Sequence, residues 1–72
     1  MKVILSDKHI GNPKILEEFG FRQVVFNKIV YSNVGIEYDM QDGKFKVYDI
    51  YGAVKLHNLL NQGIAKIVMF SK

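Results

Sequence analysis

The chain has 72 residues and a mass of 8.3 kDa, which predicts one small domain spanning residues 1–72. It contains no cysteine, so disulfides and thiolate metal sites are excluded. A chain this short buries only about 60% of its unfolded surface. Because 49% of its residues are nevertheless hydrophobic, the composition favours an oligomer.

The charge is unevenly distributed along the chain. The net charge is +3, and residues 44–72 contain five lysines against Asp49 alone. A basic half of this kind suggests a polyanionic partner. The apolar run that begins the sequence stops at Ser6-Asp7, far short of the core of a signal peptide, and no run approaches the ~20 residues of a membrane span. We therefore expect a cytoplasmic protein without a membrane segment.

The first third of the sequence predicts a strand and a short helix. Residues 1–6 form an apolar run suited to a strand. Asn12-Pro13 places a capping residue before a proline at the first helical position, which predicts a helix over 13–19. Gly20 should end this helix, with Phe21 packing back on Leu16.

The middle of the sequence predicts an antiparallel meander over about residues 21–49. Residues 21–31 are rich in β-branched and aromatic side chains and read as one strand. Residues 34–40 alternate between apolar and polar, as in a strand with one face in the core. Residues 44–48 complete the meander as the return strand.

Two turns fix the expected register of this meander. Asp42-Gly43 indicates a two-residue type I′ turn, which would pair Met40 with Phe45 and Tyr38 with Val47. A turn at Ser32-Asn33 would pair Ile29 with Ile36 and bring Lys28 opposite Glu37. Across the wet face, Asp39 would lie opposite Lys46, and Glu37 opposite Tyr48.

The last third predicts a helix and a final strand. Asp49 can cap a helix over about 50–61, which Gly63 follows. Residues 64–70 are apolar on both faces apart from Lys66, as in an interior strand. The predicted fold class is thus α+β, in which the helix covers the meander and the strands at 1–6 and 64–70 join its sheet.

The apolar surfaces near the C-terminus predict a homodimer. The helix is apolar around more than half of its circumference, so one small sheet cannot cover it. Self-association about a two-fold axis is the commonest way to bury such a surface. We expect an interface, with His57 near its edge, that draws on Leu56, Leu59, Leu60, Ile67, Val68 and Phe70.

Nucleic-acid contact is the alternative interpretation, with Lys28, Lys44 and Lys46 as its candidate residues. Phe45 alternates to the face opposite Lys44 and Lys46, so it cannot stack on a base beside them. Cross-strand pairing of the lysines with acidic residues is the simpler explanation of this strand.

Other chemistry has little support in the sequence. Lys8 and Lys14 flank a helix start that could hold an anion, but Gly11 stands alone and no phosphate-binding glycine pattern surrounds it. Asp7 and His9 have no third partner, so no metal site is predicted. We identify no cofactor motif and no nucleophile or acid–base pair, and so do not expect an enzyme.

In its size, and in the run from Val34 to Leu60 of hairpin, Asp49 cap and single helix, the chain resembles the small prophage protein family called YopT. The resemblance implies a homodimer whose subunits have one helix and three strands, and it assigns no functional residue. A composition favouring Lys, Asn, Ile, Tyr and Phe also looks like that of an AT-rich bacterial or viral gene. We therefore expect a non-enzymatic homodimeric interaction module of phage or prophage type, with a small basic nucleic-acid-binding protein as the alternative.

Overall fold

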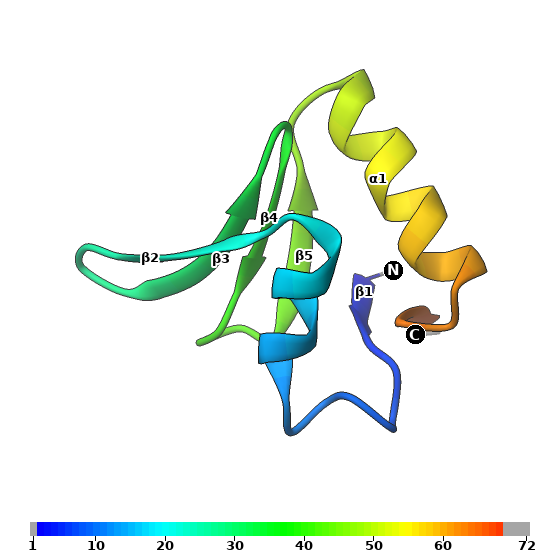
Figure 1. Cartoon of the computed structure of the whole chain (residues 1–72), viewed down its shortest axis with the longest axis horizontal. Helices are drawn as coiled ribbons and strands as arrows, with labels where there is room; N and C mark the ends of the chain where they lie inside the picture. The colour runs from blue at the N-terminus through cyan, green and yellow to red at the C-terminus, as the bar shows by residue number, and fades with distance from the viewer. Residues whose placement is uncertain (1, 69–72) are drawn as a thin grey trace, which may run out of the picture.

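The computed structural model describes residues 2–68 and has an α+β fold (Figure 1). Antiparallel strands form two sheets, which pack against one α-helix and one 3₁₀ helix. The elements follow one another as β1 (Lys2–Leu5), the 3₁₀ helix η1 (Pro13–Phe19), β2 (Arg22–Val25), β3 (Ile29–Asn33), β4 (Ile36–Asp39), β5 (Lys44–Val47), α1 (Ile50–Asn61) and β6 (Ala65–Val68).

The four strands β2-β3-β4-β5 form a meander in chain order. The sequence predicted a meander over this part of the chain, but one of three strands. The prediction of a single strand over 21–31 is wrong, because the chain reverses at residues 26–28 and pairs Val25 with Ile29. Within this loop the backbone N–H of Phe26 donates to the carbonyl of Lys28 over 3.1 Å. Asn27 is a residue type that favours turns, but the apolar residues around it led the sequence analysis to place it inside a strand.

The expected turn at Ser32-Asn33 is also wrong. The turn is at Val34-Gly35, and Asn33 pairs directly with Ile36. Gly35 has a φ of 73°, a left-handed conformation that glycine adopts without steric cost. The pairing moves by four residues relative to the expected one, so each strand keeps the same set of side chains on its core face.

The loop between β4 and β5 has four residues, 40–43, rather than two. Tyr38 pairs with Phe45 and Asp39 with Lys44, so the expected register is wrong by two residues. Only Gly43 in this loop has a positive φ, which excludes a type I′ turn. Because side chains alternate with a period of two, the slip leaves the core face as predicted.

The terminal strands are not added to the meander. β1 pairs with β6 in a separate two-stranded sheet, with Leu5 opposite Ala65. This sheet packs beside the meander through β1 and β5. The predicted strand over 64–70 extends past residue 68, and its last part lies outside the described residues.

The two predicted helical segments are confirmed in their positions. η1 spans the expected residues 13–19 as a 3₁₀ helix, and Gly20 ends it with a φ of 90°. The N–H of Phe21 donates to the carbonyl of Leu16 over 3.2 Å, the back-bond expected at this ending. α1 begins where Asp49 caps it, with the Asp49 carboxylate accepting from the N–H of Gly52 over 3.1 Å.

The core lies on one face of the meander, beneath α1, η1 and the small sheet. Tyr38 and Phe45 pack with ring centres 4.8 Å apart, and Phe21 meets Phe45 edge to face at 6.4 Å. The buried cluster consists of Leu5, Leu16, Phe21, Tyr31, Ile36, Tyr38, Phe45, Leu59, Ile64 and Ala65. It draws on every helix and on five of the six strands, all but β2, so β2 lies outside the core.

Candidate interaction surface

The hairpin of β2 and β3 projects from the body of the molecule, on the side away from α1 (Figure 1). All four residues of β2 are exposed. Val25 is 69% exposed and Phe26, at the tip, is 80% exposed. Val24 and Ile29 add further apolar surface beside them. A group of neighbouring exposed apolar side chains is a feature of interaction sites rather than of ordinary surface.

A hollow of about 300 Å³ lies beside this hairpin and reaches from its tip to β4. It is lined by Val24, Phe26, Asn27, Lys28, Val30 and Glu37. Val30 is 6% exposed and pairs with Asp39, whereas its neighbour Tyr31 pairs with Tyr38 on the core face. Since successive side chains of a strand point to opposite faces, the hollow lies on the face of the meander that is away from the core.

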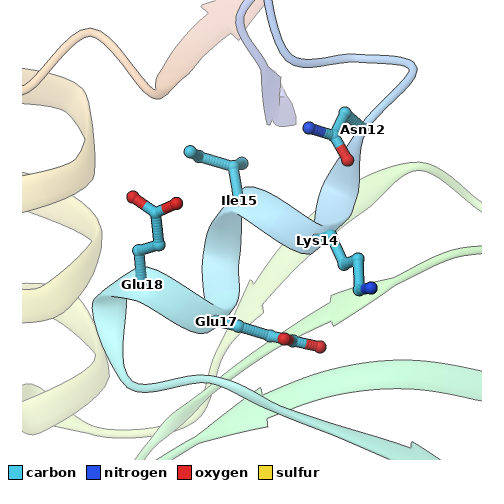
Figure 2. Close-up of a pocket in the computed structure, with 5 residues that line it drawn as sticks. All are labelled: Asn12, Lys14, Ile15, Glu17 and Glu18. Atoms are coloured by element: carbon cyan, nitrogen blue, oxygen red, sulfur yellow. The ribbon is translucent and has the colours of Figure 1, made fainter.

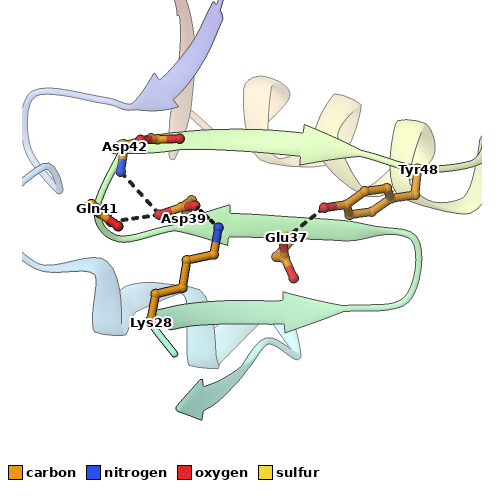
Figure 3. A network of polar contacts seen from close by, with 6 residues as sticks. All are labelled: Lys28, Glu37, Asp39, Gln41, Asp42 and Tyr48. Atoms are coloured by element: carbon orange, nitrogen blue, oxygen red, sulfur yellow. Dashed lines mark hydrogen bonds and ion pairs between the residues drawn. The ribbon is translucent and has the colours of Figure 1, made fainter. Parts of the chain in front are cut away.

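An ion pair stands beside the hollow and joins the hairpin to β4 (Figure 3). Lys28 Nζ lies 2.6 Å from Asp39 Oδ2, and the other carboxylate oxygen accepts the backbone N–H groups of Gln41 and Asp42 at 2.8 and 3.2 Å. The hydrogen bond from Lys28, with those from the backbone, lowers the pKa of Asp39 from 3.8 to about 2. The same hydrogen bond to Asp39 raises the pKa of Lys28.

Further along the same face, Tyr48 Oη donates to Glu37 Oε1 over 2.9 Å (Figure 3). This hydrogen bond raises the pKa of Tyr48. The sequence predicted that Glu37 and Tyr48 lie near each other, and the contact exists although Lys46 is the direct partner of Glu37 in the ladder.

The expected pairing of Asp39 with Lys46 is wrong, because the shifted register puts Lys44 opposite Asp39. The expected partner of Lys28 was Glu37, and the ion pair to Asp39 replaces it.

The two edges of the meander differ in chemistry. β5 carries Lys44 and Lys46 at one edge, where β1 also packs. β2 forms the other edge, and within residues 2–68 its only strand neighbour is β3. Arg22 is its single charged residue. Charged residues on an edge strand protect it from pairing with another chain, so β5, with two lysines, is better protected than β2, with one arginine.

The predicted interface residues near the C-terminus lie at different depths. Leu59 is 1% exposed and belongs to the core of the single chain. Leu56 and Leu60 are half-buried and pack against that core. Val68, at the end of β6, is also half-buried. Ile67 is 47% exposed. Phe70 lies outside the described residues.

The three lysines proposed for nucleic-acid contact come together on the open face of the meander, and each has an acidic neighbour. Lys28 forms the ion pair with Asp39. Lys44 lies opposite Asp39 in the ladder, and Lys46 lies opposite Glu37. This arrangement agrees with the simpler interpretation of the sequence, in which the lysines pair with acidic residues across the strands.

Of the two lysines proposed for an anion site, Lys14 lines a hollow that also has two glutamates, whereas Lys8 is exposed and is not among its lining residues. A hollow of about 410 Å³ is lined by Asn12, Lys14, Ile15, Glu17 and Glu18, and Figure 2 shows that the Glu17 side chain extends on the same side of η1 as that of Lys14. Nearby, Asp7 forms an exposed ion pair of 2.7 Å with Lys66. The two glutamates would repel an anion bound in this hollow.

Sequence reasoning missed the residues of the hairpin because it placed Val24, Val25 and Phe26 inside one long strand. The available signal was Asn27-Lys28, a polar pair with a turn-forming residue within an apolar run. Which strand would form the less protected edge could not be read from the sequence, since it depends on the order of strands in the sheet.

Within residues 2–68 there is no cluster of three or more histidine, aspartate or glutamate side chains placed to hold a metal ion. In the same part of the chain, no helix has the length and apolar character needed to cross a membrane. The chain matches no protein-family model, no curated protein and no solved structure.

Proposed function

We propose that the protein is a small non-enzymatic interaction module that works as a homodimer. The observation that carries the proposal is the projecting hairpin, where Val24, Val25 and Phe26 are exposed at a sheet edge that no strand of residues 2–68 covers. Small proteins cover such surfaces by association. The composition, which looks like that of an AT-rich bacterial or viral gene, supports a phage or prophage role. The six strands of residues 2–68 differ from the three that the resemblance to a prophage family implied.

Three sets of polar contacts have local structural roles, which supports a binding role rather than a catalytic one. Asp49 caps α1, and Asp39 holds together the β4–β5 loop and Lys28. The His57 ring lies 3.4 Å from the Asn61 amide on the exposed side of α1. Each of these groups stabilises a local element of the fold.

The experiment that tests this function measures the mass of the protein in solution and its affinity for polyanions. We expect light scattering over the micromolar range to give twice the 8.3 kDa mass of the chain. We also expect weak retention on heparin, since Lys28, Lys44 and Lys46 have acidic neighbours. A monomer at every concentration would contradict the homodimer. Strong retention that falls steeply with salt would instead favour the nucleic-acid-binding alternative.

A further inference from the structure

We infer that the homodimer forms by edge-to-edge pairing of β2 with β2 of a second copy, in antiparallel orientation about a two-fold axis. This inference rests on the proposed homodimer and assigns its interface. It places the association at the β2–β3 hairpin, rather than at α1 and β6 where the sequence alone suggested it.

The backbone of β2 is the first reason. β3 pairs with one side of β2, and in the described part of the chain no strand pairs with the other side. Every second N–H and C=O group of an edge strand points away from its sheet, so β2 offers a row of hydrogen-bonding groups to a further strand. All four of its residues, Arg22–Val25, are exposed.

The symmetry of an antiparallel pair restricts the register. The two-fold axis stands perpendicular to the sheet, so it keeps each side chain on its own face. Residues directly opposite each other on two paired strands lie on the same face of the sheet. With this axis, that condition is met only if one residue of β2 lies opposite the same residue of the second copy. Centring on Val24 pairs Gln23 with Val25 of the second copy and Arg22 with Phe26 of the second copy. This register uses all of β2 and the exposed Phe26.

The charges of β2 are compatible with a second copy as the occupant. Arg22 is the single charged residue of β2, and in this register the two arginines lie at opposite ends of the paired strands. They are about 14 Å apart along the strand direction, since each residue advances about 3.4 Å. This distance exceeds the screening length of about 8 Å at physiological salt, so their repulsion is small. Each guanidinium also lies opposite an aromatic ring, a favourable contact.

The apolar surfaces also meet in this arrangement. Val24 lines the hollow above the buried Val30, so a two-fold axis at Val24 brings the hollows of two copies side by side. On the other face, Val25 is exposed on the paired strand itself, and Ile29 is exposed on β3 behind it. The assembly closes after two copies, because both β2 edges are used and the outer edges are the lysine-bearing β5 strands.

Lysine substitutions on three surfaces test the inference. Val25→Lys alters the hairpin, Ile67→Lys alters β6, and Val54→Lys alters α1. The three side chains are 69%, 47% and 64% exposed, so each variant should fold, as circular dichroism would verify. We expect Val25→Lys to weaken dimerisation at least tenfold in sedimentation experiments, with the other two variants within twofold of the wild type.

Because the chain has no cysteine, single-cysteine variants give a second readout. Under mild oxidation, Val24→Cys should form a disulfide-linked dimer, because residues that face each other across two strands lie within disulfide reach. Asn58→Cys, on the exposed side of α1, should remain monomeric under the same denaturing conditions.

The outcomes separate this inference from the proposed function. If Ile67→Lys or Val54→Lys dissociates the wild-type dimer and Val25→Lys does not, the β2 interface is wrong and the homodimer still stands. A monomeric wild type would overturn both, and would be the result if β2 instead accepts a strand of a different protein. Loss of dimer in Val25→Lys together with crosslinking of Val24→Cys would establish the interface.

Discussion

The backbone of Gly35, in the turn between β3 and β4, lies directly against the backbone of Gly52 in the first turn of α1. A β-carbon added to Gly52 would overlap the carbonyl group of Gly35, whose oxygen accepts a hydrogen bond of 2.8 Å from the N–H of Tyr48. The same first turn of α1 is capped by Asp49. Two glycines therefore set how closely the helix approaches the meander.

We predict that Gly52→Ala destabilises the protein by about 3 kcal/mol, because rigid backbone atoms must move apart to admit the methyl group. Alanine is favoured over glycine inside a helix by only about 1 kcal/mol, so the overlap outweighs this gain. Urea denaturation would measure the change. Gly11→Ala is the control, since nothing lies within 4 Å of the added carbon, and it should change stability little. Equal stability of the two variants would contradict the close contact.

The ion pair of Lys28 and Asp39 predicts a dependence of stability on pH. The pKa of Asp39 is about 2 in the folded protein and 3.8 for an ordinary aspartate, so the unfolded chain takes up the proton first as the pH falls. The stabilisation is therefore complete above about pH 4 and is lost between about pH 4 and 2.

Thermal unfolding across this range should show a steeper decline for the wild type than for Asp39→Asn. The control is Asp7→Asn, because Asp7 is also paired but its side chain is 86% exposed, and exposed pairs stabilise little. If all three proteins lose stability in parallel, Asp39 does not carry the acid sensitivity.

The β4–β5 loop predicts different effects for its two last residues. Gly43 has a φ of 70°, so Gly43→Val should cost about 1–3 kcal/mol, since a β-branched residue resists this conformation. Asp42 contributes its backbone N–H to Asp39, and its φ is not positive. Asp42→Ala should therefore change the free energy of unfolding by less than about 0.5 kcal/mol. A comparable loss in both variants would indicate the type I′ turn that the structure excludes.

The burial of Leu59 distinguishes a core residue from an interface residue. It is 1% exposed, so Leu59→Ala should cost about 2–5 kcal/mol in urea denaturation. Val54→Ala, on an exposed position of the same helix, should stay within about 0.5 kcal/mol of the wild type. If Leu59→Ala weakened self-association without lowering the stability of the fold, Leu59 would belong to an interface instead.

Local signals in the sequence predicted the elements that depend on local interactions. Asp49 and the residues that follow it specify where α1 begins, and Pro13 and Gly20 bound η1. The core face of the meander also follows from alternation alone, which is why it survives the change of register.

The register itself depends on interactions that the sequence does not reveal. Asp39 binds two backbone N–H groups of its own loop and Lys28 of the β2–β3 loop, and this combination favours four loop residues over two. The pairing of β1 with β6 likewise joins the two ends of the described chain. The candidate surface could not be predicted for the same reason, since β2 becomes an edge only when the order of strands is known.

The most direct test of the β2 interface is amide hydrogen exchange of the wild type, measured at concentrations below and above the dimerisation midpoint. We predict that the outward-pointing amides of β2 exchange more slowly as the dimer forms, because they become hydrogen-bonded to the second copy. The amides of β5, at the opposite edge, should exchange at the same rate at both concentrations. A dimer whose β2 amides exchange as fast as those of the monomer would contradict the account.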